Sequence, residues 1–172
     1  VSSVNSAGFF LSDDPAQPAR NAALLDATVR LKADALNVLV GGGPESLCLE
    51  QAREMALAGL AAFAADAWAA RVRLVVEPMW MADVFGKSCV NSIVQLERAA
   101  SSIPGLALNL DYYHSWPDPD LGRVLRGESL PVGLLQICDV DSRIFRRYSP
   151  LIKPLQPIMT FRIPLQLCLS RW

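Results

Sequence analysis

The sequence predicts an α/β protein built on a parallel sheet. Apolar runs that stop at a polar residue recur along the chain, at 72–77, 106–111 and 132–138. With a fourth run at 35–40, their centres are 26 to 37 residues apart, the length of a strand–helix–strand crossover. Strands that are apolar on both faces are typical of a parallel sheet covered by helices.

The first expected elements are a strand within 1–10 and a helix that follows it. Asp14 is a helix-capping residue, and Pro15 suits the first helical position. Apolar residues then recur at helical spacing: Ala22, Leu25, Val29 and Ala33.

A second strand is expected at 35–40. The glycines at 41–43 close it, and we interpret them as a tight turn rather than a phosphate-binding loop. Ser46 can cap a long helix. The apolar stripe of this helix predicts its buried face: Ala52, Ala56, Leu60, Phe63 and Ala67.

The later elements repeat this alternation. A third strand at 72–77 stops at Pro78, and Ser88 can cap the next helix. The expected buried face of that helix is Ile93, Leu96 and Ala100. A strand at 106–111, a short helix at 119–125 and a strand at 132–138 complete the series.

Five strands fit either an open doubly wound sheet or part of an eight-stranded barrel. A full barrel needs about 250 residues, so a barrel requires strands beyond both ends of these 172 residues. An open sheet normally carries a GxGxxG turn after its first strand, which the glycines at 41–43 do not provide.

The composition and net charge give no support for nucleic acid or a membrane as a partner. Hydrophobic residues make up 52% of the chain and charged residues 19%, as in a folded domain. A net charge of −1 gives no electrostatic reason to expect nucleic acid or an anionic membrane as a partner. The apolar stretches are interrupted before they reach membrane-spanning length.

Four cysteines and one histidine do not predict a structural zinc site. Cys48, Cys89, Cys138 and Cys168 form no CxxC pair, so we interpret them as buried or free thiols. Reduced thiols and the lack of a basic and apolar leader at the first residues predict a cytoplasmic protein.

Glu77 and Asp111 are the strongest candidates for chemistry, because both end buried strands. In parallel α/β folds the carboxyl ends of the strands carry the functional groups. His114, the single histidine, follows Asp111 by three residues, so the pair can hold a cation or orient a substrate hydroxyl. The alternatives are a helix-capping carboxylate and a surface histidine.

Gln136 ends the last strand, and its amide oxygen is a suitable ligand for hard cations. The alternative is an amide that satisfies a neighbouring strand. Asp139 and Asp141 are interpreted as loop caps. Aromatic residues in the loops above the same rim can wall a sugar pocket or cover an interface: Trp80, Phe85, Tyr112 and Trp116.

Three motifs in this order resemble the xylose isomerase-like TIM barrel family. They are Val-Val-Glu77-Pro, Leu-Asn-Leu-Asp111-Tyr-Tyr-His114 and Leu-Gln136-Ile-Cys-Asp139. The resemblance covers 35–141 as barrel strands four to seven, with 1–10 as strand three. It implies an incomplete (β/α)8 barrel domain over 1–141, with helices outside the parallel strands.

The resemblance implies a metal-dependent isomerase or epimerase of sugars or sugar phosphates that moves a proton through an enediolate. A divalent cation (Mn, Mg or Zn) would be held by Glu77, Asp111 and Gln136. Glu77 and His114 would be catalytic. His114, Trp80, Trp116 and Arg143 would contact the sugar, and a homo-oligomer is compatible with the resemblance.

The chain departs from the family pattern at two places. Gln136 stands where the family usually has a histidine, and no acidic residue occurs in 142–172 to supply the glutamate of strand eight. The segment 142–172 is therefore interpreted as a truncated or frame-damaged end, or a loosely packed extension. The alternatives are an inosose dehydratase-like lyase of the same fold, or a non-catalytic remnant or binding module.

Overall fold

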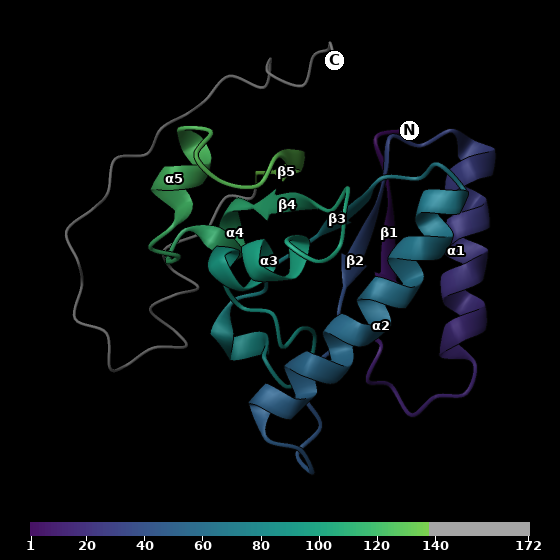
Figure 1. The fold of residues 1–172 in the computed structure, drawn as a ribbon, viewed down its shortest axis with the longest axis horizontal. Coiled ribbons are helices and arrows are strands. Elements are labelled where there is room, and N and C mark those ends of the chain that lie inside the picture. The colour runs from purple at the N-terminus through teal and green to yellow at the C-terminus, as the bar shows by residue number, and fades with distance from the viewer. Residues whose placement is uncertain (138–172) are drawn as a thin grey trace, which may run out of the picture. The chain divides into compact units, whose positions relative to one another are not determined.

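Five parallel strands form one sheet in the order β1-β2-β3-β4-β5 (Figure 1). This computed structural model describes residues 1–137. The strands are β1 (Ser3–Gly8), β2 (Ala35–Leu39), β3 (Leu74–Val76), β4 (Ala107–Asp111) and β5 (Val132–Gln136). The helices are α1 (Gln17–Leu31), α2 (Leu49–Ala69), the 3-10 turn η1 (Met81–Asp83), α3 (Ile93–Ala100), α4 (Tyr112–Ser115) and α5 (Leu121–Leu125).

The sequential strand order decides between the two architectures that the sequence allowed. A doubly wound sheet reverses its strand order and carries helices on both faces, whereas a barrel adds each strand beside the previous one. Here each strand pairs with the next one along the chain. The described residues therefore form an α/β sheet of the TIM barrel type.

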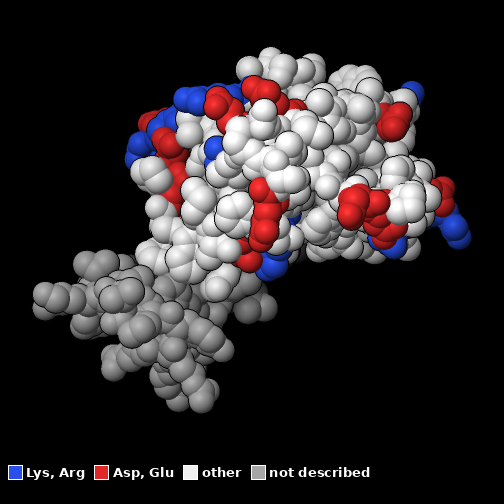
Figure 2. All heavy atoms as spheres, turned by 90° about the horizontal axis from the view of Figure 1, so that it is seen from below, with Lys and Arg blue, Asp and Glu red and all other residues white. Residues whose placement is uncertain are grey.

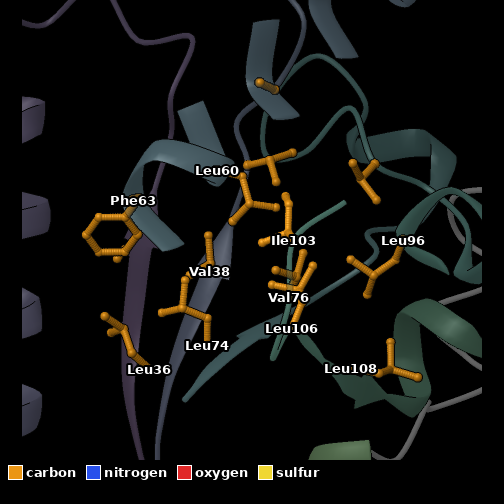
Figure 3. Close-up of a cluster of buried hydrophobic side chains, with 14 of the residues drawn as sticks. Leu36, Val38, Leu60, Phe63, Leu74, Val76, Leu96, Ile103, Leu106 and Leu108 are labelled. Carbon is orange, nitrogen blue, oxygen red and sulfur yellow. The ribbon is translucent and has the colours of Figure 1, made fainter. Parts of the chain in front are cut away.

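The helices pack on one face of this sheet and form the main core with it (Figure 3). Leu36 and Val38 of β2 and Leu60 of α2 belong to this core, and all three are 0% exposed. Burying one such side chain contributes about 1.5–3 kcal/mol to folding. The packed helices hold the strands in place, and this sets the spacing of the residues at the carboxyl ends of the strands.

On the opposite face of the sheet, the side chains near the amino ends of the strands are small and apolar. Ala35, Val75 and Ala107 form a second buried cluster there, with Leu134 packed against it. A Cβ atom added at Gly133 would lie 2.6 Å from Val75 Cγ1, so this face has little spare space. Polar residues replace the apolar ones toward the carboxyl ends of the strands.

Helix α2 confirms its predicted stripe, because its buried residues are the five expected ones. Helix α1 forms where the apolar spacing predicts a helix, but its buried residues are the polar Asn21 and Thr28, and Val29 is 47% exposed. Asn21 turns inward and binds the backbone of Gly8.

Three predicted helix starts were wrong by a few residues. Helix α1 begins at Gln17, because Asp14 accepts a hydrogen bond from the Ala16 amide in the turn before it. Cys48, not Ser46, is the N-cap of α2. Ser92, not Ser88, caps α3, and Ala99 rather than Ala100 is buried there. Ser88 is fully buried in the preceding loop, where its hydroxyl bonds to Val90.

The glycines at 41–43 bring two loops together at the carboxyl end of the sheet. Gly41 accepts a hydrogen bond from the Cys89 amide at 2.8 Å, and the Gly43 amide donates to Val84 at 3.0 Å. A Cβ atom on Gly42 would lie 2.0 Å from the Phe85 carbonyl oxygen. The glycines therefore permit a close approach of the loop after β3, which goes beyond the predicted tight turn.

The surface of the described residues carries charges of both signs, which lie side by side on the face in Figure 2. Within residues 1–137 no helix is long and apolar enough to cross a membrane. Several predictions fall outside the described residues: Cys138, Asp139, Asp141, Arg143, Cys168 and the segment 142–172.

Candidate metal centre

Two carboxylates and an imidazole meet where β3 and β4 end. Glu77 directly follows β3, and its amide still bonds to the Val38 carbonyl at 3.3 Å. Asp111 is the last residue of β4 and caps α4 by accepting a hydrogen bond from the Tyr113 amide at 2.8 Å. This one-turn helix carries His114 back over the strand ends. One ligand atom each of Glu77, Asp111 and His114 lies within 4.8 Å of the others.

His114 is held by groups on both sides of its ring. Its side chain is 8% exposed, with Nε2 3.9 Å from Glu77 Oε1 and Nδ1 3.8 Å from Asp83 Oδ2. Nδ1 also accepts a long hydrogen bond from the Trp80 amide at 3.4 Å. The Tyr113 ring stands edge-on at 4.8 Å. The imidazole therefore presents Nε2 to the carboxylate.

Glu77 is a buried carboxylate with a raised pKa. It is 7% exposed, and burial raises its pKa above the ordinary value, with the negative charge of Asp111 adding to the effect. The hydrogen bond from Asn37 and the neighbouring His114 act in the opposite direction. Glu77 Oε2 accepts from Asn37 Nδ2 at 2.9 Å and from Asn109 Nδ2 at 3.1 Å.

Gln136 joins the same group from β5. It pairs with Asp111 in the register of the sheet, and its Oε1 accepts a hydrogen bond from Asn109 Nδ2 at 2.8 Å. Asn109 thus links Gln136 to Glu77. Gln136 is only partly buried.

Of the predicted aromatic residues, Trp80 and Phe85 lie in the segment after β3, Tyr112 begins α4 and Trp116 follows α4. Trp80 is half-buried, and its ring stands edge-on to Tyr113 with centroids 6.5 Å apart. Trp116 is 37% exposed just after α4, while Tyr112 and Phe85 are more exposed still. Of the predicted substrate contacts, Arg143 lies outside the described residues.

Sequence reasoning missed three residues of the site. Asn37 and Asn109 lie inside strands rather than at their ends, and Asp83 lies in η1. The two asparagines do leave a signal in the sequence, because each is a single amide within an otherwise apolar run. Asp83 leaves no comparable signal.

The chemistry of these side chains fits a divalent cation. Two buried carboxylates repel each other unless a positive charge compensates them, and the pKa of Glu77 is raised first by burial and then by the negative charge of Asp111. Carboxylate and amide oxygens suit Mg²⁺ and Mn²⁺, and an imidazole suits Zn²⁺ as well. Residues 77, 111 and 136 can therefore supply ligands, with His114 beside them.

The sequence matches the family described as xylose isomerase-like TIM barrel over residues 1–151. The chain belongs to this family. No curated protein matches the chain. The expected fold of this xylose isomerase-like chain is thereby confirmed.

Solved structures show the same fold. Protein SMc04130 from Sinorhizobium meliloti 1021 is 29% identical, with a TM-score of 0.67 over 82% of this chain and 54% of that one. The 3-keto-D-glucoside 4-epimerase YcjR from E. coli is 14% identical, with a TM-score of 0.63 over 81% and 59%. The IOLI protein with a binding zinc atom is 14% identical, with a TM-score of 0.61 over 81% and 51%.

This xylose isomerase-like chain spans between half and three fifths of the length of these three structures. The last two are too distant in sequence to indicate more than the fold. The same fold nevertheless occurs in a 3-keto-D-glucoside 4-epimerase and in a protein with a bound zinc atom.

Proposed function

We propose that the chain carries the cation-binding and proton-transferring part of a sugar or sugar phosphate isomerase or epimerase. One observation carries this proposal: Glu77, Asp111 and His114 converge within 4.8 Å at the carboxyl ends of two neighbouring strands in a xylose isomerase-like chain. An epimerase among the proteins of similar fold supports the same reaction class.

The proposed cation ligands are Glu77, Asp111 and Gln136. A bound divalent cation (Mn, Mg or Zn) would offset negative charge on substrate oxygens. The carboxylates would keep that cation next to the buried imidazole of His114.

Glu77 is the proposed base. Its buried carboxylate, with its raised pKa, accepts the proton from the carbon beside the substrate carbonyl. The C–H electron pair forms the carbon–carbon double bond of an enediolate, and the carbonyl electron pair moves onto oxygen. Return of a proton to the former carbonyl carbon, while the proton of the adjacent hydroxyl passes to the former carbonyl oxygen, gives an isomer. Return to the opposite face of the same carbon gives an epimer.

His114 is proposed to bind a substrate oxygen and to hold or release a proton at Nε2. Its ring is fixed by the Trp80 amide and lies near Asp83, so it need not reorganise when substrate binds. Trp80 and Trp116 are proposed to wall the sugar, and Arg143 is the proposed basic contact.

The first test is calorimetric titration of the full 172-residue chain with Mn²⁺. We expect about one cation per chain, and Asp111→Asn should weaken binding at least about tenfold because a ligand charge is removed. The matched control is Asp26→Asn on α1, where the aspartate is exposed and only faces Arg30. Absence of binding, or an equal loss in both variants, would refute the metal centre.

The reaction is tested by incubating the loaded chain with ketoses, aldoses and their phosphates, with mass and chromatographic detection. A product of unchanged mass and altered mobility supports isomerisation or epimerisation. A product that has lost water assigns the chain to the lyases of this fold. If the chain binds a sugar but converts none of those tested, the result supports a non-catalytic binding module.

A further inference from the structure

Two buried asparagines lie in the strand interiors behind the metal centre. Asn37 of β2 is 3% exposed and Asn109 of β4 is 0% exposed. Both belong to the face of the sheet that the small cluster of Ala35, Val75 and Ala107 occupies nearer the amino ends. An apolar residue would suit such a position better, because a buried amide must find partners for all its polar atoms.

The nitrogen of each asparagine donates to a proposed cation ligand. Asn37 Nδ2 donates to Glu77 Oε2 at 2.9 Å. Asn109 Nδ2 donates to the same oxygen at 3.1 Å and to Gln136 Oε1 at 2.8 Å. An amide nitrogen has two hydrogens, so Asn109 can make both bonds at once.

The side-chain oxygen of each asparagine, in contrast, makes no hydrogen bond among the described residues. Asn37 Oδ1 and Asn109 Oδ1 are buried and have no hydrogen-bond partner among the described residues. An unpaired buried oxygen opposes folding, so the two amides are poor choices for stability. Their donors, in contrast, are all directed at Glu77 and Gln136.

We propose that Asn37 and Asn109 are positioning residues of the metal centre. Together they hold Glu77 by Oε2 and leave Oε1, the oxygen that faces His114, for the cation. Asn109 in addition fixes the amide oxygen of Gln136 beside Glu77, and an amide oxygen keeps a second lone pair for a cation. This inference rests on the proposed function, because it needs a cation at Glu77.

The inference predicts how strongly each of three variants loses affinity for Mn²⁺. Asn109→Ala loosens two ligands, whereas Asn37→Ala loosens one. Asn21→Ala is the matched control: Asn21 is 6% exposed and binds the backbone of Gly8, away from the metal centre. The order of lost Mn²⁺ affinity should therefore be position 109, then 37, with no loss at 21.

Calorimetric titration of the full chain with Mn²⁺ tests the order. Loss of a residue that orients a ligand typically weakens metal binding by about 10–100-fold, and we expect Asn109→Ala near the upper end. Circular dichroism and thermal unfolding establish that each variant is folded. Wild-type affinity in both Asn37→Ala and Asn109→Ala, or a loss at Asn21→Ala equal to theirs, would overturn the inference.

A measurement on the wild-type chain covers the case in which a variant fails to fold. The side-chain amide signals of the asparagines are followed by ¹H–¹⁵N spectroscopy during titration with Zn²⁺, a diamagnetic cation. Signals of Asn37 and Asn109 should shift as the ligands they bind become coordinated, while that of Asn21 stays in place. Binding of Zn²⁺ with no shift at either position would overturn the inference.

The two proposals fail in different ways. A wild-type chain that binds no cation overturns both the metal centre and the role of the asparagines. A wild-type chain that binds Mn²⁺ with an affinity that Asn37→Ala and Asn109→Ala both retain overturns only the role of the asparagines.

Discussion

At the scale of single residues, the candidate metal centre depends on the charges and hydrogen bonds around Glu77. Its carboxylate is buried beside a second carboxylate, Asp111, and burial is the main cause of its raised pKa. Two amide donors and an imidazole offset only part of this cost. Without a cation, the fold therefore favours the protonated form of Glu77 more than the unfolded chain does.

This balance predicts how the stability of the metal-free chain depends on pH. Between the ordinary pKa of about 4.5 and the raised pKa in the fold, the native state binds more protons than the unfolded state. The free energy of unfolding should therefore fall as pH rises through this window. Glu77→Gln removes the titration, so this variant should be more stable than wild type at neutral pH.

Urea unfolding in a chelating buffer, from about pH 4.5 to about pH 8, measures the effect. Asp26→Gln, an exposed carboxylate on α1, serves as the control and should follow wild type. The same pH dependence in wild type and Glu77→Gln would show that the pKa of Glu77 is not raised.

Much of the site could be predicted from residue type and position. Glu77, Asp111 and His114 follow from the rule that parallel strands present polar residues at their carboxyl ends, and the structure brings them together. Asn37 and Asn109 escaped the same rule because they lie one or two positions inside the strands. A rule that treats any lone polar residue in an apolar strand as a possible ligand support would have found them.

At the scale of elements, the buried face of a helix can be predicted from the sequence when its apolar residues lie along one side. Helix α2 has a continuous apolar stripe, and the structure buries the whole stripe. Helix α1 has apolar residues around much of its circumference, so spacing alone could not choose the face that a hydrogen bond from Asn21 to Gly8 selects. The start of α1 was displaced because Asp14 accepts a hydrogen bond in the turn before the helix, and that of α3 because the hydroxyl of Ser88 is buried and bonds to Val90. A backbone turn from Pro44 to Leu47 precedes α2.

Helix α2 should be the most sensitive element to core truncation. Leu60 is 0% exposed and packs in the main core, so Leu60→Ala should cost about 2–5 kcal/mol of the free energy of unfolding. Met55, on the same helix, is 54% exposed, and Met55→Ala should change stability by no more than about 0.5 kcal/mol. Urea unfolding of both variants measures the difference, and equal losses would contradict the packing described for α2.

At the scale of the whole molecule, the order of the strands determines where the chemistry is. Because β1 to β5 are parallel and sequential, residues from β2, β3, β4 and β5 reach one rim although they are far apart in sequence. The sequence allowed either an open sheet or a barrel, since both contain the same alternation of strands and helices. The barrel differs from the open sheet in that sequential strands pair with each other and the helices cover one face. Neither feature can be recognised from local sequence patterns.

A cation at this rim would join neighbouring strands, so its binding should stabilise the whole fold. At a free Mn²⁺ concentration of about 100 times its dissociation constant, binding adds about 2.7 kcal/mol to the free energy of unfolding. For a chain of 172 residues this corresponds to a rise in Tm of about 5–10 °C. Asp111→Asn should lose about half of this rise or more, because binding that is at least about tenfold weaker leaves at most about 1.4 kcal/mol at the same Mn²⁺ concentration. Thermal unfolding of both chains with Mn²⁺ and with chelator measures it. Equal rises in wild type and Asp111→Asn would mean that Mn²⁺ acts somewhere other than the ends of β3 and β4.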